Sequence, residues 1–228
     1  MSRPIQQNLP YTDQLTLVDT LTTTAAGVLP LALTGVEGFG GPTVAYGLTM
    51  PPWVFNDCQD YLSLTSGDDL TLVTFDIVGK DIYGNDINET VDPGPNAGTV
   101  TSTYQYAQIT SITSNAAVTD LTITNSGTPL SRLIIPDYNR HNWAAAFQTH
   151  CEDATIEYDV WIALNPILVE GSLDPATITG LSILSLAPAA DKTYQKILSF
   201  PITALWVDVG TASATDPLIF TFLQQGIS

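Results

Sequence analysis

The residues best suited to bind a metal ion lie in one acidic stretch, KDIYGNDINETVDPGPNAGTV, at residues 80–100. Asp81, Asp86 and Glu89, with the carbonyls of a glycine-containing turn, offer oxygen ligands of the kind that Ca²⁺ prefers. A calcium-binding EF-hand loop, however, needs acidic or Asn residues at alternate positions, Gly at the sixth position and Glu at the twelfth. The stretch lacks that spacing. We therefore expect no metal site, and instead a solvent-facing acidic hairpin that turns at Gly84-Asn85.

Acid–base or nucleophilic catalysis would depend on two histidines, His141 and His150, because histidine is the ordinary base near neutral pH. His150 precedes Cys151, and neighbouring side chains on a strand point to opposite faces. The chain contains no G-x-S-x-G, no phosphate-binding Gly-Lys-Ser/Thr loop and no H-E-x-x-H motif. We therefore expect no catalytic residues and no cofactor. Trp143, beside these histidines, is expected to stack in a turn.

Carbohydrate chemistry would need two carboxylates across a groove, or exposed aromatic rings. Adjacent acids occur at Asp68-Asp69 and Glu152-Asp153, where they suit the ends of loops better than a cleft. The four tryptophans are scattered along the chain: Trp53, Trp143, Trp161 and Trp206. The last two fall within predicted strands, which favours a place in the core or at an interface.

The elements that position these side chains are predicted to be strands, because apolar residues mostly recur with a period of two. Val73, Phe75 and Ile77 are expected to share one face of a strand. The closing segment PLIFTFLQQG is apolar on both faces, which indicates a central strand or an interface. Only PPWVFNDCQDYLSL, at residues 51–64, allows a short helix as an alternative to strands. The chain is therefore predicted to be all-β.

The predicted organisation is two β-sandwich-like domains, immunoglobulin-like or jelly-roll-like, with an extended N-terminal arm. The arm covers residues 1–14, which are polar and show neither the helical nor the strand period. The small-residue segment SGTPLSR, at residues 126–132, separates a first β domain (15–129) from a second (130–228). Within the first domain, residues 70–126 are predicted to form a four-stranded meander.

The charge balance limits the kinds of partner. The chain has 6 Lys and Arg residues against 23 Asp and Glu residues, a formal net charge of −17. Nucleic acids require clustered Lys and Arg, and anionic membranes attract polybasic segments, so neither is an expected partner. Because only 13 % of residues are charged, the polar surface must consist mainly of Thr, Ser, Asn and Gln. We therefore expect contacts with other proteins.

The cysteines and the apolar segments indicate where the chain folds. Cys58 and Cys151 are too few for a disulfide framework, so we expect buried thiols. The N-terminal stretch lacks the apolar core of a signal peptide, and the longest apolar run is too short to cross a bilayer. We therefore expect a soluble protein that is made in a cytoplasm.

The segment VGKDIYGNDINETVDPGPNAGTVTSTYQYAQITSIT resembles structural proteins of tailed bacteriophage particles. In those proteins a strand, an acidic Y-G-N hairpin, a Gly-Pro-rich turn and an I-T-S-I-T strand follow in the same order. The segments TPLSRLIIPDYNRHNW, TIEYDVWIAL and FTFLQQG resemble their closing part, so the likeness covers roughly residues 70–228. The resemblance implies a non-enzymatic virion component without a cofactor, assembled in many symmetric copies inside the host bacterium.

Three functions follow from this sequence as expectations. The leading one is a capsid decoration or minor head protein that binds the major capsid protein and stabilises the assembled shell. The alternative is a tail or head-to-tail connector protein that forms a ring with copies of itself. The third, from a different class, is a carbohydrate-binding or hydrolytic β-sandwich module. The final third of the sequence lacks the long basic or fibrous segments of receptor-binding fibres, which argues against host recognition.

Overall fold

The structure, a computed structural model, describes residues 4–9, 15–29, 34–35, 53–54, 58–136, 144–152, 155–164, 180–186, 193–212 and 216–224. Within these residues every regular element is a β-strand, and neighbouring strands run antiparallel. The prediction of an all-β protein is therefore confirmed. In the described part of the chain there is no helix long and apolar enough to cross a membrane.

The chain forms two compact units. Unit 1 comprises Met1–Tyr11 and Gly127–Ser228, and unit 2 comprises Thr12–Ser126. The division after Ser126 lies at the small-residue segment that suggests a boundary in the sequence. The first residues of the chain, in contrast, belong with its C-terminal half.

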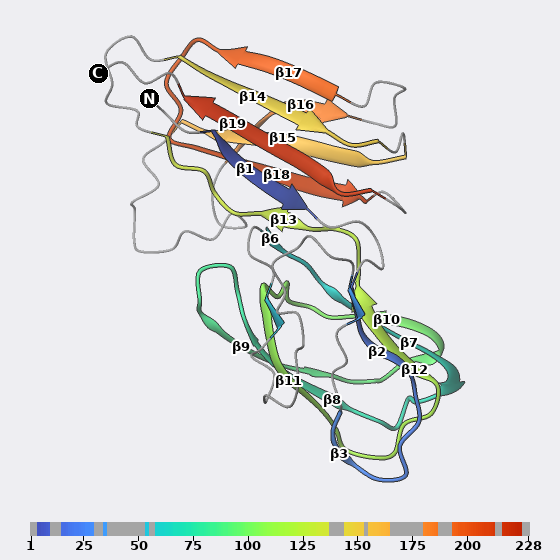
Figure 1. Cartoon of the computed structure of the whole chain (residues 1–228). Coiled ribbons are helices and arrows are strands. Elements are labelled where there is room, and N and C mark those ends of the chain that lie inside the picture. The colour runs from blue at the N-terminus through green and yellow to red at the C-terminus, as the bar shows by residue number, and fades with distance from the viewer. Residues whose placement is uncertain are drawn as a thin grey trace. The chain divides into compact units, whose positions relative to one another are not determined.

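The pairing of β1 (Ile5–Leu9) with β19 (Leu218–Gln224) explains this arrangement. The two strands are antiparallel partners over all of β1, and Figure 1 shows them side by side in blue and red. The predicted arm at residues 1–14 therefore contains a sheet strand. The sequence Ile-Gln-Gln-Asn-Leu lacks the apolar–polar alternation that predicts a strand, because the inward-facing residue Gln7 is polar. Gln7 is 4 % exposed, and its amide donates a hydrogen bond to the Arg132 carbonyl at 2.9 Å.

Unit 2 is built from two sheets. Sheet B has the strand order β10 (Asn96–Thr101), β7 (Leu62–Asp69), β12 (Leu121–Asn125), β2 (Leu15–Leu21) and β4 (Thr34–Gly35). Sheet C has the order β3 (Gly27–Val28), β11 (Gln108–Ser114), β8 (Phe75–Lys80) and β9 (Asp86–Val91), and β5 (Trp53–Val54) also pairs with β11. The short strand β6 (Cys58–Gln59) precedes β7.

Alternation of apolar and polar residues places the core of unit 2 on one face of each sheet. Phe75 and Ile77 of β8 are completely buried, as are Leu64 of β7 and Ile123 of β12. The residues next to these buried side chains along each strand carry hydroxyl or carboxyl groups, and these groups face outward. The prediction that one face of a strand is buried is confirmed for Phe75 and Ile77, whereas Val73 is buried but precedes β8 in the turn after β7.

The meander predicted for residues 70–126 is wrong, because only β8 and β9 form a hairpin of neighbouring strands. β10 pairs with β7 in sheet B, whereas β11 pairs with β8 in sheet C. The stretch that reads as one long strand at residues 99–113 is therefore two strands in different sheets. A helix at residues 51–64 is also wrong for the described residues, which lie in β5, β6 and β7.

The chain crosses from sheet C to sheet B through a Pro-Gly-Pro segment in which Gly94 and Pro95 are buried. The Gly94 amide donates to the Val73 carbonyl at 3.1 Å, and the Leu70 amide donates to the Pro95 carbonyl at 2.8 Å. A Cβ atom on Gly94 would lie 2.6 Å from the Leu70 carbonyl oxygen and 2.7 Å from that of Val73. This segment is therefore a packed crossover in which only glycine fits.

Unit 1 is also built from two sheets. Sheet A has the strand order β1, β19, β14 (Ala145–His150) and β17 (Thr193–Leu198). Sheet D contains, in order, β16 (Leu181–Leu186), β15 (Glu157–Ala163), β18 (Ala204–Thr211) and β13 (Leu130–Ser131). β19 lies between β1 and β14, which confirms that the closing apolar segment is a central strand.

The inner faces of sheets A and D hold the core of unit 1. Phe147, Phe220 and Phe222 point inward from sheet A, and Val160 and Val207 point inward from sheet D. Hydrogen bonds join the two sheets, since the Thr149 and Tyr158 hydroxyls are in contact and the Lys196 ammonium donates to the Ile183 carbonyl at 2.8 Å. The unit is thus a two-layer arrangement of antiparallel sheets.

Candidate functional site

The acidic hairpin is organised around Asp81, at the end of β8. One oxygen of its carboxylate accepts hydrogen bonds from the amides of Tyr83 and Asn85, both at 2.8 Å, and the other accepts from the Asn85 side chain at 2.6 Å. Gly84 has a φ of 88°, a conformation that glycine adopts without strain. Asp81 therefore stabilises the turn, and its oxygens are already occupied by protein donors.

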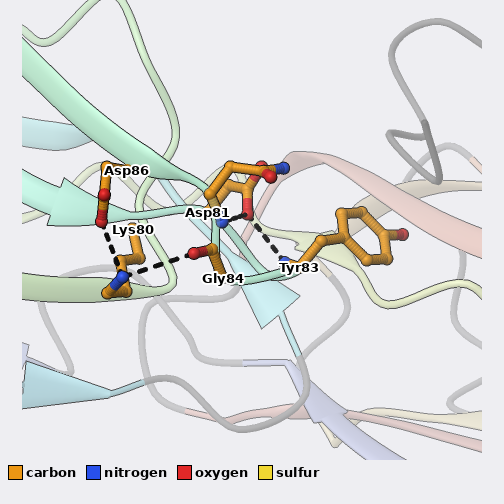
Figure 2. A network of polar contacts seen from close by, with 6 residues as sticks. Lys80, Asp81, Tyr83, Gly84 and Asp86 are labelled. Carbon is orange, nitrogen blue, oxygen red and sulfur yellow. Dashed lines mark hydrogen bonds and ion pairs between the residues drawn. The ribbon is translucent and has the colours of Figure 1, made fainter. Parts of the chain in front are cut away.

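Asp86 makes an exposed ion pair in the same hairpin. Its carboxylate lies 2.6 Å from the Lys80 ammonium, with 76 % and 38 % of the two side chains exposed. Figure 2 shows Lys80 between the carboxylate of Asp86 and the carbonyl of Gly84, while the Tyr83 ring points away from both. Exposed pairs of this kind contribute only about 0–1 kcal/mol to folding.

Glu89 faces the other side of β9 from Asp86, because side chains three positions apart on a strand point in opposite directions. One carboxylate oxygen accepts from the Thr103 amide at 2.5 Å. The other accepts from the Tyr104 amide at 3.3 Å and from the Tyr106 hydroxyl at 2.9 Å. Glu89 therefore holds the loop between β10 and β11. The expectation that the whole hairpin end faces solvent is wrong for this residue.

These contacts give the three acids three separate structural roles. Asp81 closes a turn, Asp86 pairs with a lysine on the outer face of sheet C, and Glu89 anchors a loop on the inner side. No group of three or more His, Cys, Asp or Glu side chains suited to a metal ion occurs in the described part of the chain. Among those residues the hairpin does not bring ligands together.

The residues considered for catalysis are separated or have other partners. The His150 ring contacts the Thr193 hydroxyl at 2.8 Å on the outer face of sheet A. Cys151 is buried, and its thiol donates to the Asp216 carbonyl at 3.7 Å; Cys58 is a second buried thiol, in the other unit. The expectation of buried thiols is confirmed for both cysteines. His141 and Trp143 lie outside the described residues.

Trp161 and Trp206 pack against each other rather than forming an open platform. Their rings are stacked at 11° with centroids 6.3 Å apart, and Trp206 is 4 % exposed. Gly180 covers them so closely that a Cβ atom there would lie 2.5 Å from the Trp206 ring. Trp206 is therefore in the packed structure, as its place in a predicted strand favours, whereas Trp161 is half-buried beside it. The side chain of Trp53 is not among those described.

The carboxylate doublets also lie at the ends of elements. Asp69 closes β7, where hydrogen bonds from the side chain and then the backbone of Thr71 lower its pKa. Glu152 is exposed directly after β14, and Asp153 lies outside the described residues. A different pair of acids is adjacent across strands. Asp159 and Asp208 are direct partners in β15 and β18, and burial, followed by the charge of Asp159, raises the pKa of Asp208.

The outward faces of the two sheets in unit 1 differ in charge. Sheet D presents the carboxylates of Glu157, Asp159 and Asp208. Sheet A presents no Asp, Glu, Lys or Arg among the outward side chains that the structure describes. Those side chains are Gln6, Ala146, Gln148, His150, Thr193, Gln195, Ile197, Ile219, Thr221 and Leu223. We call this set the neutral face.

The neutral face is arranged in cross-strand rows. An apolar row runs through Ile197, Ala146 and Leu223, in which Ile197 is 78 % and Leu223 45 % exposed. The adjacent row consists of Gln195, Gln148, Thr221 and Gln6, and the first two amides are joined by a hydrogen bond of 2.9 Å. In a chain of net charge −17, this surface is the strongest candidate for a functional contact.

Single-sequence reasoning missed the neutral face because its residues come from four strands that are far apart in the chain. The only local signal was the apolar character of both faces of the closing strand. No protein-family model, curated protein sequence or solved structure matches this chain.

Proposed function

We propose that this protein is a non-enzymatic structural component of a tailed bacteriophage particle, most directly a decoration or minor head protein that stabilises the assembled shell. The sequence likeness over residues 70–228 supplies the biological class. The observation that carries a structural rather than an enzymatic role is the neutral face, a broad uncharged sheet surface on a strongly acidic chain. Such a surface suits contact with protein, and its partners would be copies of this chain and the major capsid protein.

The contacts of the acidic hairpin also support a structural rather than an enzymatic role. The acids that looked most suitable for an ion are engaged in a turn, an ion pair and a loop anchor. The strongly acidic surface suits the outside of a particle, which must remain dispersed at high concentration. We further propose that each unit is a β-sandwich of the immunoglobulin-like or jelly-roll type. The chain's repeated crossing between sheets B and C supports this.

The proposal is tested on particles of the phage that encodes this chain. Mass spectrometry of purified particles should detect the protein, and a cryo-electron microscopy map should place its density on the shell. Addition of the purified protein to shells that lack it should raise their thermal stability. A ligand present at 100 times its dissociation constant stabilises its target by about 2.7 kcal/mol. Absence of the protein from the particles would contradict the proposal.

Experiments of the same kind distinguish two other functions from the proposed one. Density in a ring at the head–tail junction or in the tail would support the connector or tail alternative. Glycan-array binding or hydrolysis of bacterial polysaccharide would support a carbohydrate-active module. The stacking of Trp161 on the buried Trp206 argues against that third function.

A further inference from the structure

We infer that the neutral face of sheet A binds the neutral face of a second copy of this chain, related to the first by a two-fold axis. The inference deepens the proposed function, because it names the surface through which copies contact one another. It rests on that function only for its biological setting. The contact itself is a property of the purified chain.

Charge restricts where two copies can meet. Each copy carries a formal charge of −17, so most pairs of surfaces repel. On sheet D the outward carboxylates of Glu157, Asp159 and Asp208 would oppose a second acidic surface. Across the neutral face no described side chain is Asp, Glu, Lys or Arg, so two copies can approach there without opposing carboxylates. Burial of the exposed Ile197 and Leu223 would then favour contact.

The pattern of side chains is complementary to itself. In a two-fold contact both partners use the same surface. Each side chain must therefore be compatible with the identical surface that lies opposite it. The apolar row of Ile197, Ala146 and Leu223 can pack against its counterpart. The row of Gln195, Gln148 and Gln6 can hydrogen-bond with its counterpart, because each amide both donates and accepts. A row of like charges would not have this property.

The edge of the sheet argues for contact through the face rather than by adding strands. β17 is an edge strand, and its Lys196 points inward to the Ile183 carbonyl of sheet D. Inward-pointing charge on an edge strand hinders pairing with another chain. The face itself remains open, with Ile197 78 % exposed.

The size of the face sets the expected strength of the contact. Four strands about 4.8 Å apart and six residues long cover roughly 400 Å². A standard stable interface buries about 800 Å² per partner, so a contact of about half that size should be weak when it forms alone. High local concentration in a symmetric assembly would strengthen such a contact.

The first test is sedimentation of the purified full chain from about 5 µM to 1 mM. We expect reversible dimers that strengthen as salt rises from 0.1 to 1 M, because salt screens the repulsion between acidic copies. Ile197→Glu should weaken the dimer at least about tenfold, since it introduces carboxylates into the contact. Leu72→Glu adds the same charge at a site in unit 2 that is 91 % exposed and should leave the dimer unchanged. A chain that stays monomeric to 1 mM in high salt would overturn the inference.

The second test locates the contact. Gln148 lies in the middle of the neutral face, whereas Thr65 faces outward from sheet B. The native thiols, 1 % and 3 % exposed, should not interfere. Sheets that pack face to face lie about 10 Å apart, so with a short bis-maleimide crosslinker Gln148→Cys should form a covalent dimer and Thr65→Cys should not. Equal crosslinking of the two variants, or an equal effect of Ile197→Glu and Leu72→Glu, would place the contact elsewhere. Such a result would leave the proposed function intact, because detection of the protein in particles tests that separately.

Discussion

Replacement of Glu89 by Gln should destabilise unit 2 far more than its position in an acidic hairpin suggests. The carboxylate accepts hydrogen bonds from the amides of Thr103 and Tyr104 and from the Tyr106 hydroxyl. Hydrogen bonds to a charged group contribute about 1.5–3 kcal/mol each, and the value falls where water competes. Glutamine keeps one acceptor oxygen but replaces the other with a donor, so at least one of the three contacts is lost. We expect a loss of about 1–2 kcal/mol.

The contact between Glu89 and Tyr106 can be isolated with a double-mutant cycle. Tyr106 is fully buried, and its hydroxyl has a strongly raised pKa because of burial and then the bond to Glu89. It therefore remains a donor at neutral pH. Tyr106→Phe removes this donor with little change of shape and should cost about 1 kcal/mol. In the Glu89→Gln background it should cost at least about 0.5 kcal/mol less.

Scanning calorimetry is the appropriate assay, with Asp86→Asn as the matched control. That control removes an exposed ion pair from the same strand and should change stability by no more than about 0.5 kcal/mol. For a unit of this size, about 1 kcal/mol corresponds to roughly 4 °C in Tm. Unit 1 contains Trp143, Trp161 and Trp206 and unit 2 contains Trp53, so in a Trp53→Phe background the tryptophan fluorescence transition of unit 1 provides an internal reference. Equal melting temperatures for Glu89→Gln and Asp86→Asn would refute the role of Glu89 as a loop anchor.

Other substitutions test the packing and charge of the two units. Gly94→Ala should destabilise unit 2 by about 2 kcal/mol or more, because its Cβ would lie within 2.7 Å of two carbonyl oxygens. Gly98→Ala, whose nearest neighbour lies at 3.5 Å, should cost much less in the same denaturant titration. Asp208→Asn should stabilise unit 1 at pH 7 by less than about 1 kcal/mol, because a raised pKa means that the ionised carboxylate opposes folding. The native residue's contribution is fully present below the ordinary carboxyl pKa and is lost as the pH rises through the raised value. Melts from pH 3 to pH 8 should therefore show the advantage of Asn vanishing toward acid, and an advantage that grows toward acid would contradict the assignment.

Period-two patterns predicted the strands well where one face is apolar and the other polar. Phe75 and Ile77 of β8 are buried as their alternation indicates, and β19, which is apolar on both faces, is a central strand. The same reasoning failed for β1, where the inward residue is Gln7 and its partner, the Arg132 carbonyl, is distant in the chain. Local pattern also gave no sign that the chain leaves sheet C at Gly94, because that crossover depends on close contact with the Leu70 and Val73 backbone.

The site residues show the same limit. Ligand spacing argued against a calcium loop, and the structure shows Asp81 and Glu89 bonded to protein donors. The sequence did not indicate that Glu89 faces inward, because the residues it contacts, Thr103, Tyr104 and Tyr106, lie beyond the next strand. The neutral face could not be predicted from the sequence for a related reason. It is defined by the register of four strands, and a one-residue change in any register would replace its side chains.

The pairing of β1 with β19 has a consequence for the order in which the protein is made. Ile5 finds its partner only when Phe222 has left the ribosome, about 10–40 s later at 5–20 residues per second. Thr12–Ser126 is continuous and can fold during that interval, while the opening strand waits unpaired. The polar sequence Gln-Gln-Asn at the centre of β1 is an advantage during this interval, because an unpaired apolar strand would be prone to aggregate. The polar residues that make β1 hard to predict as a strand would thus keep the nascent chain soluble until β19 has been synthesised.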